Sequence, residues 1–127
     1  MKPALLPNEY VLATKLKDSP LRGDVVIFNN SEKNIDVVKR VVGLPGEEIE
    51  SQEGSILINS EVISDPWAKS FVDDFVKVNL GPDEIFVLGD QRTISSSDSR
   101  TMGPIKFSDC WKLKVRYWPY YRFKTYE

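Results

Sequence analysis

The 127-residue sequence contains no histidine and only one cysteine, Cys110. The lack of histidine excludes a Ser-His-Asp triad, a Cys-His dyad and a histidine-rich zinc site. A single cysteine cannot form a disulfide within the chain. Because Cys110 lies between Phe107 and Trp111, we expect a small buried apolar residue rather than a nucleophile. Any base chemistry must therefore come from a lysine, a carboxylate or a chain terminus.

The sequence also lacks long apolar runs and a strong excess of one charge. No stretch of 18 apolar residues occurs, which excludes a transmembrane helix within residues 1–127. No secretory signal is visible at the start either. The formal net charge of −2 argues against a general nucleic-acid binder. The basic residues between 112 and 124 are expected to form a solvated strand face, with a specific basic patch as the alternative.

Short apolar runs separated by Gly, Pro and Asn turns dominate the rest of the chain. They predict strands at residues 10–14, 25–28, 35–42, 48–50, 55–59, 62–63, 85–88 and 111–118. Many short strands with such turns indicate one mainly β domain, of the sandwich or barrel-like kind. Trp67, Phe71 and Phe75 are spaced by four. This spacing leaves two alternatives for residues 64–79: one or two helical turns, or a loop whose aromatic side chains pack on the core.

A lysine among β-branched residues is the strongest candidate for a base. Val37, Lys39 and Val41 share one face of the predicted strand, because side chains alternate along a strand. If that face is buried, desolvation lowers the pKa of the amine. Base activity near pH 7 needs a fall of roughly three units from about 10.4, which costs about 4 kcal/mol. Arg40 cannot take this role because a guanidinium keeps its proton. The alternative is an ordinary exposed lysine on a strand.

Four segments follow one another along the chain: L-R-G-D-V-V-I-F (21–28), V-K-R-V-V-G-L-P-G-E (38–47), L-G-D-Q-R with S-S-D-S-R and G-P-I (88–92, 96–100, 103–105), and R-Y-W-P-Y-Y-R-F (116–123). In this order they resemble the boxes of type I signal peptidases, the Ser/Lys leader-peptidase family. Gln91 stands where asparagine is usual, and one extra residue lies between Arg92 and Ser96. Counting back from D-S-R places the family's lysine-orienting serine at Ser96, with Ser95 as the alternative.

The resemblance implies roles for individual residues. Lys39 resembles the general base that takes the proton of the nucleophilic serine and later returns it to the leaving amine. Ser96 resembles the hydroxyl that orients this lysine, as the third group of a nucleophile–base–orienter arrangement. Asp98 and Arg100 resemble an ion pair that braces the loop. Asp90 is expected to have a structural role.

The family's first box, S-M-x-P-T-L, resembles M-K-P-A-L at residues 1–5, where Met1, Pro3 and Leu5 match. These three residues are expected to contribute to substrate binding. The nucleophilic serine would then fall immediately before Met1, with the membrane anchor further upstream, so we expect the printed chain to be inactive by itself. A serine of the 95–99 loop is not expected to replace it, because serine-rich loops mostly bond their own backbone.

The resemblance implies a signal-peptidase-like β fold of antiparallel sheets, barrel- or sandwich-like and with little helix. Residues 1–127 would form a single catalytic domain, with residues 52–80 as a small cap-like insertion. The implied activity is that of a serine-type endopeptidase that removes signal peptides after small residues, as in Ala-x-Ala, without metal or cofactor. The preprotein would bind as an added strand near residues 35–42 or 80–88. The enzyme would be membrane-associated, with its catalytic domain on the outer side and no nucleic-acid partner.

Two alternatives to this activity remain open. The first is a non-catalytic homologue that binds secretory or pilin-like segments without cutting them, and the absent serine motivates it. The second is a soluble cytoplasmic maturation protease of the same fold, which acts on a propeptide. The residue encoded before Met1 distinguishes the catalytic readings from the non-catalytic one.

Overall fold

A computed structural model describes residues 10–30, 34–68, 72–90, 92, 98–118 and 124–125. Most elements in this part of the chain are strands. One sheet contains β1 (Tyr10–Lys15), β2 (Val25–Asn30), β3 (Ile35–Gly43), β8 (Glu84–Leu88), β9 (Ile105–Lys106), β10 (Trp111–Trp118) and β11 (Lys124–Thr125). A second sheet contains β4 (Glu48–Gln52), β5 (Ser55–Ile58), β6 (Glu61–Val62) and β7 (Phe75–Asn79). The helical elements are α1 (Ser99–Met102) and the 3-10 turn η1 (Phe107–Asp109).

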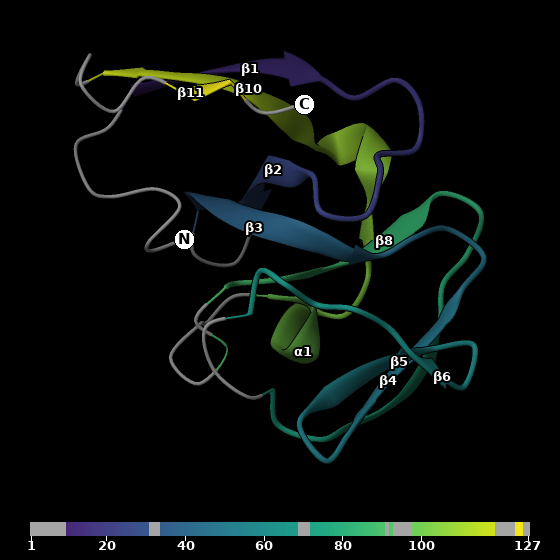
Figure 1. The fold of residues 1–127 in the computed structure, drawn as a ribbon. Coiled ribbons are helices and arrows are strands. Elements are labelled where there is room, and N and C mark those ends of the chain that lie inside the picture. The colour runs from purple at the N-terminus through teal and green to yellow at the C-terminus, as the bar shows by residue number, and fades with distance from the viewer. Residues whose placement is uncertain are drawn as a thin grey trace.

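The larger sheet has the strand order β1-β10-β2-β3-β8-β9, and β11 pairs with β10. In Figure 1, β1, β10 and β11 lie together at the top, while β2 and β3 cross the middle of the molecule. Every pairing among the described strands is antiparallel. The expected fold of antiparallel sheets with little helix is therefore confirmed, and the described strands form open sheets rather than a closed barrel.

The smaller sheet lies at the lower right of Figure 1 and has the order β6-β5-β4-β7. Two tight hairpin turns build it, Glu53-Gly54 between β4 and β5 and Asn59-Ser60 between β5 and β6. All four turn residues have positive φ, the conformation that two-residue hairpin loops of type I′ require. The sheet begins at Glu48, four residues before the predicted insertion at 52–80, and its role as a cap stays a prediction.

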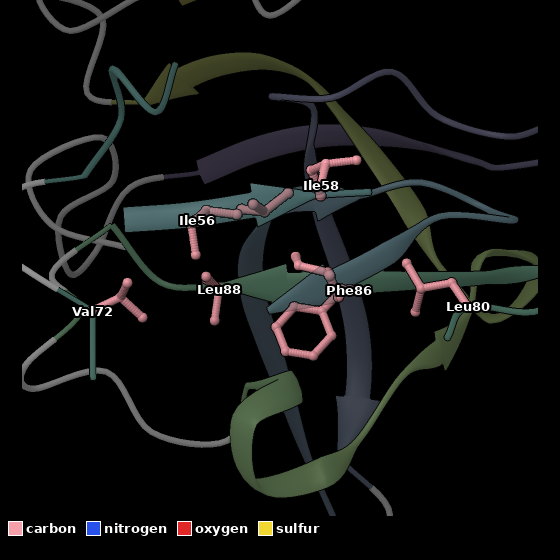
Figure 2. Close-up of a cluster of buried hydrophobic side chains, with 8 residues drawn as sticks. Ile56, Ile58, Val72, Leu80, Phe86 and Leu88 are labelled. Atoms are coloured by element: carbon pink, nitrogen blue, oxygen red, sulfur yellow. The ribbon is translucent and has the colours of Figure 1, made fainter. Parts of the chain in front are cut away.

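Two clusters of buried apolar side chains hold the strands together, and β8 contributes to both. Its odd-numbered residues, Ile85 and Val87, join the cluster beneath β2 and β3, which includes Val26, Phe28, Val37, Val41 and Cys110. Its even-numbered residues, Phe86 and Leu88, join the cluster under the smaller sheet, where Figure 2 shows them with Ile56, Ile58, Val72 and Leu80. This alternation is the period of two that a strand imposes on its side chains.

The helical alternative for residues 64–79 is wrong within the described part of that range. Phe75 begins strand β7, and residues 64–68 form a turn and extended chain. The Phe75 ring stacks on Phe86 with centroids 5.0 Å apart, so this aromatic residue packs on the core as the loop alternative required. Sheet pairing with β4 overrides the fourfold spacing, while Phe71 lies outside the described residues.

Strand β10 is present over all eight predicted residues, but its first apolar position differs from expectation. Leu113 is fully buried, whereas Trp111 is 46% exposed. Trp111 is the first residue of the strand, and the ammonium of Lys15 on the neighbouring β1 lies 5.5 Å from its ring centroid. Cys110, directly before it, is buried as expected.

Candidate active site around Lys39

Lys39 lies in the middle of β3, directly opposite Val26 of β2. Its neighbours on the same face, Val37 and Val41, belong to the buried cluster that also contains Val26. Only 8% of the lysine is exposed. Burial lowers the pKa of the Lys39 amine below its ordinary value, and the charge of Arg100 lowers it further, while those of Asp98 and Asp90 act in the opposite direction. The sequence predicts a lowered pKa only if this face of β3 is buried, and the structure shows that it is.

Asp98 and Arg100 lie at the start of α1. The carboxylate of Asp98 caps this helix by accepting a hydrogen bond from the Arg100 N–H at 3.0 Å. It also forms an ion pair with the Arg100 guanidinium, with an N–O distance of 2.8 Å, and the Asp98 side chain is almost fully buried. A side chain that accepts from the first helical N–H groups fixes where a helix begins. These two residues therefore fix the start of α1.

Ser99 ties α1 to the larger sheet, a contact that sequence reasoning missed. Its hydroxyl accepts a hydrogen bond from the Val87 N–H of β8 at 2.9 Å. Both groups are buried, where an unpaired N–H would be costly. The only sequence signal was that Ser99 belongs to the S-S-D-S-R segment. Through this bond the Asp98–Arg100 pair is held beside the strand that pairs with β3.

Arg40, the residue after Lys39, is held on the opposite face of β3. Its guanidinium makes two hydrogen bonds to the Asp90 carboxylate, at 3.1 and 2.9 Å, and a third to the Gly23 carbonyl at 3.0 Å. Both side chains of the ion pair are largely buried. A two-bonded arginine–carboxylate pair fixes geometry as well as charge. Asp90 therefore connects the chain after β8 to the strand that carries the lysine.

Two further arginine–carboxylate pairs have no local sequence pattern and were also missed. Arg22 pairs with Glu47, which joins the R-G-D segment to the L-P-G-E segment. Arg92 pairs with Asp65 at 2.7 and 3.0 Å, and the Arg92 side chain is fully buried. The partners are 25 and 27 residues apart in sequence, so only the fold brings them together.

Several predicted site residues lie outside the described residues: Ser96, Met1, Pro3 and Leu5. The expected hydrogen bond between the Lys39 amine and the Ser96 hydroxyl stays a prediction, as does the orientation of this amine toward Met1. What the described residues do show is a buried primary amine whose pKa is lowered, and a lysine in this state can act as a base.

Strand β3 is paired on both sides along only part of its length. Strand β8 pairs with β3 from Arg40 onward, whereas Ile35–Val38 pair with β2 alone among the described residues. The predicted substrate edges at 35–42 and 80–88 thus lie largely inside the sheet, and residues 35–38 are a part of β3 with which no second described strand pairs. No described helix has the length and apolar character needed to cross a membrane.

The chain is similar to known proteins over nearly its whole length. The family model described as signal peptidase, peptidase S26, matches residues 1–118. Signal peptidase I of Bacillus caldolyticus is 32% identical over 142 aligned residues, which cover 97% of this chain and 77% of that protein. Signal peptidase I P of Bacillus subtilis subsp. natto is 32% identical over 114, covering 79% of this chain and 61% of that protein.

A solved structure is similar as well. The crystal structure of a signal peptidase I from Enterococcus faecalis matches with a TM-score of 0.64 and 28% sequence identity. The match covers 73% of this chain and 94% of that one. The arrangement of sheets described above is thus shared with an experimental structure.

Proposed function

We propose, since this chain belongs to the signal peptidase family, peptidase S26, that Lys39 is the general base of a Ser/Lys endopeptidase that removes N-terminal signal peptides. The family consists of serine-type endopeptidases and is generally membrane-associated. The observation that carries the proposal is the burial of Lys39 among the valines of β3, which lowers its pKa. A lysine without a chemical role has no reason to occupy that position, because desolvating an ammonium costs stability.

In the proposed reaction, a serine hydroxyl beside Met1 gives its proton to the neutral Lys39 amine and attacks the scissile carbonyl. The lysine ammonium then donates the proton to the departing amine, which leaves an acyl-serine ester. The same amine, neutral again, activates the water that hydrolyses this ester. Ser96 would orient the amine. The Asp98–Arg100 pair and the Ser99–Val87 bond support this role because they hold the segment after Ser96 against β8.

The substrate is proposed to be an extended segment with small residues before the cleaved bond, as in Ala-x-Ala. The edge at Ile35–Val38 supports binding as an added strand, since among the described residues it pairs with β2 and with no second strand. Met1, Pro3 and Leu5 would contact the small substrate residues and so contribute to their binding. We further propose that an upstream membrane anchor holds the domain at the outer face of the membrane, where preproteins emerge.

Two versions of the chain test the proposal, one with serine and one with alanine immediately before Met1. Both are incubated with a fluorogenic Ala-x-Ala peptide, with Lys39→Met in the serine version as a third protein. We expect cleavage only by the serine version with intact Lys39, because loss of one member of such a unit costs on the order of a million-fold in rate. A folded serine version that binds the peptide without cleaving it would instead support the non-catalytic alternative.

A further inference from the structure

The segment between β6 and β7 contacts two arginines, Arg40 of β3 and Arg92 in the chain after β8. Asp65 accepts two hydrogen bonds from the Arg92 guanidinium, at 2.7 and 3.0 Å. The side chain of Arg92 is fully buried and that of Asp65 is 16% exposed. Arg92 also donates to the Gly89 carbonyl. A buried guanidinium needs its carboxylate, because removal of one partner leaves an uncompensated charge. The position of Arg92 therefore depends on Asp65.

Trp67 makes the second contact, two residues further along. Its ring centroid lies 5.7 Å from the guanidinium carbon of Arg40, within the range of a cation–π interaction. The ring also packs directly on the backbone of Gly23, where an added Cβ would lie only 2.4 Å from the Trp67 Cζ2 atom. Because Arg40 donates to the Gly23 carbonyl, the indole covers the point at which Arg40 meets the R-G-D turn.

The contacts of Asp65 and Trp67 reach two segments near Lys39: its own strand β3, through Arg40, and the chain after β8, through Arg92. Arg40 is its neighbour in β3, and Asp90, the partner of Arg40, lies two residues before Arg92. The predicted Ser96 falls in sequence between Arg92, which Asp65 holds, and Ser99, which the Val87 N–H holds. The charged groups that act on the lysine are Asp98 and Arg100 at the start of α1 and Asp90, two residues after the end of β8.

We propose that Asp65 and Trp67 are positioning residues, which clamp Arg92 and Arg40 and so hold the chain after β8 in register with the lysine of β3. Neither residue needs to touch the substrate. The clamp would make the smaller sheet part of the catalytic unit, because its connecting segment holds Arg92, which lies four residues before the predicted Ser96. This inference rests on the proposed function only in taking Lys39 as the base.

The test measures the titration of Lys39 directly, so it does not depend on cleavage. The lysines are dimethylated with 13C-formaldehyde, the Lys39 signal is assigned with Lys39→Arg, and its midpoint is followed by NMR. Asp65→Asn is compared with Asp74→Asn, an exposed aspartate of the same region, and Asp65→Glu serves as the conservative rescue. Thermal unfolding of each protein shows that it is folded at the temperature of the titration.

We expect Asp65→Asn to raise the Lys39 midpoint by roughly half a unit or more, because a displaced chain after β8 readmits water to the amine. Loss of the carboxylate charge alone would lower the midpoint, since it leaves Arg92 uncompensated. A rise therefore indicates positioning. Asp74→Asn is expected to leave the midpoint unchanged, and Asp65→Glu to lie closer to the unsubstituted protein than Asp65→Asn does.

The possible outcomes separate this inference from the proposed function. If the Lys39 midpoint is low in the unsubstituted protein and Asp65→Asn does not raise it, the clamp is overturned and the base role stays intact. An ordinary midpoint near 10.4 in the unsubstituted protein overturns the base role itself. In the serine version, the clamp further predicts that the acid limb of the kcat/KM profile moves to higher pH in Asp65→Asn.

Discussion

Arg22 and Glu47 form an ion pair with two hydrogen bonds, at 2.9 and 2.8 Å, between the turn before β2 and the turn before β4. Arg22 also donates to the Val42 carbonyl at 2.7 Å, and Glu47 accepts from the Leu44 N–H at 2.6 Å. Burial tends to raise the pKa of Glu47, but its bonds to Arg22 and Leu44 and the charge of Arg22 outweigh this, so the pKa is lowered. Two segments of the family pattern are thus joined through side chains.

Glu47→Gln is expected to destabilise the protein by about 2 kcal/mol at pH 7, because bonds to a charged group are lost. Since the Glu47 pKa is lowered in the folded state, its contribution is complete above the ordinary value of 4.5 and is lost as pH falls through the lower folded value. Urea unfolding at pH 7 and pH 3 measures both effects. The difference between the two proteins should shrink at pH 3.

The exposed pair of Glu48 and Lys77 provides a control for that comparison. Its atoms are 3.6 Å apart and both side chains are more than 40% exposed. Glu48→Gln should change the free energy of unfolding by less than about 0.5 kcal/mol, since exposed ion pairs contribute little. An equal loss in Glu47→Gln and Glu48→Gln would contradict a special role for the Arg22–Glu47 pair.

Lys39→Met should leave stability unchanged or increase it, because it removes a buried amine and keeps the length of the side chain. The Lys39 pKa is lowered in the folded state, so the unsubstituted protein loses stability as pH falls from its ordinary value of 10.5 toward the lower folded value. The gain from Lys39→Met should therefore be larger at pH 7 than at pH 10, as denaturant unfolding at both pH values will show. Marked destabilisation at pH 7 would argue against the buried position.

Gly23→Ala is expected to cost roughly 2–4 kcal/mol, from left-handed backbone strain and overpacking against Trp67. Gly23 has φ of +95°, and the added methyl would overlap the indole ring. Gly46→Ala is the matched control, since φ there is +80° and nothing lies within 4 Å of the added atom. Its cost should be only the backbone strain, about 1–2 kcal/mol. Thermal or urea unfolding of both variants isolates the contact with Trp67.

Cys110 should be almost unreactive toward thiol reagents in the folded protein. It is fully buried, and burial raises the pKa of its thiol to about 12, so little thiolate forms at pH 8. Labelling at pH 8 followed by mass spectrometry should show reaction only as the chain unfolds, and addition of urea should accelerate it. Rapid labelling of the native protein would contradict the described burial.

The elements were predicted where local chemistry determines them. Apolar runs indicated β2, β3 and β8, and Glu53-Gly54 and Asn59-Ser60 indicated the two hairpin turns whose positive φ the structure shows. Strand β7 was not predicted, because its alternation is weak: Phe75 and Val78 pack inward across an irregularity in the pairing with β4. Pairing with a neighbour, rather than its own pattern, makes this segment a strand.

Of the candidate site, the sequence predicted the residues that lie in local patterns but not the contacts between distant segments. The valines around Lys39 indicated a buried amine, and Asp98 and Arg100 followed from the family pattern. The contacts of Asp65 and Trp67 were not predictable, because their partners Arg92 and Arg40 lie 27 residues away along the chain in each case. Such pairs depend on how the two sheets meet, which no local pattern specifies.

The placement of β8 between the two apolar clusters has a consequence for how the protein unfolds. Successive side chains of this five-residue strand are shared between the two apolar clusters, so neither cluster loses its packing without exposing half of β8. The two sheets should consequently melt in one all-or-none transition rather than one after the other. The amide hydrogens of residues 85–88 should then be among the last to exchange with solvent.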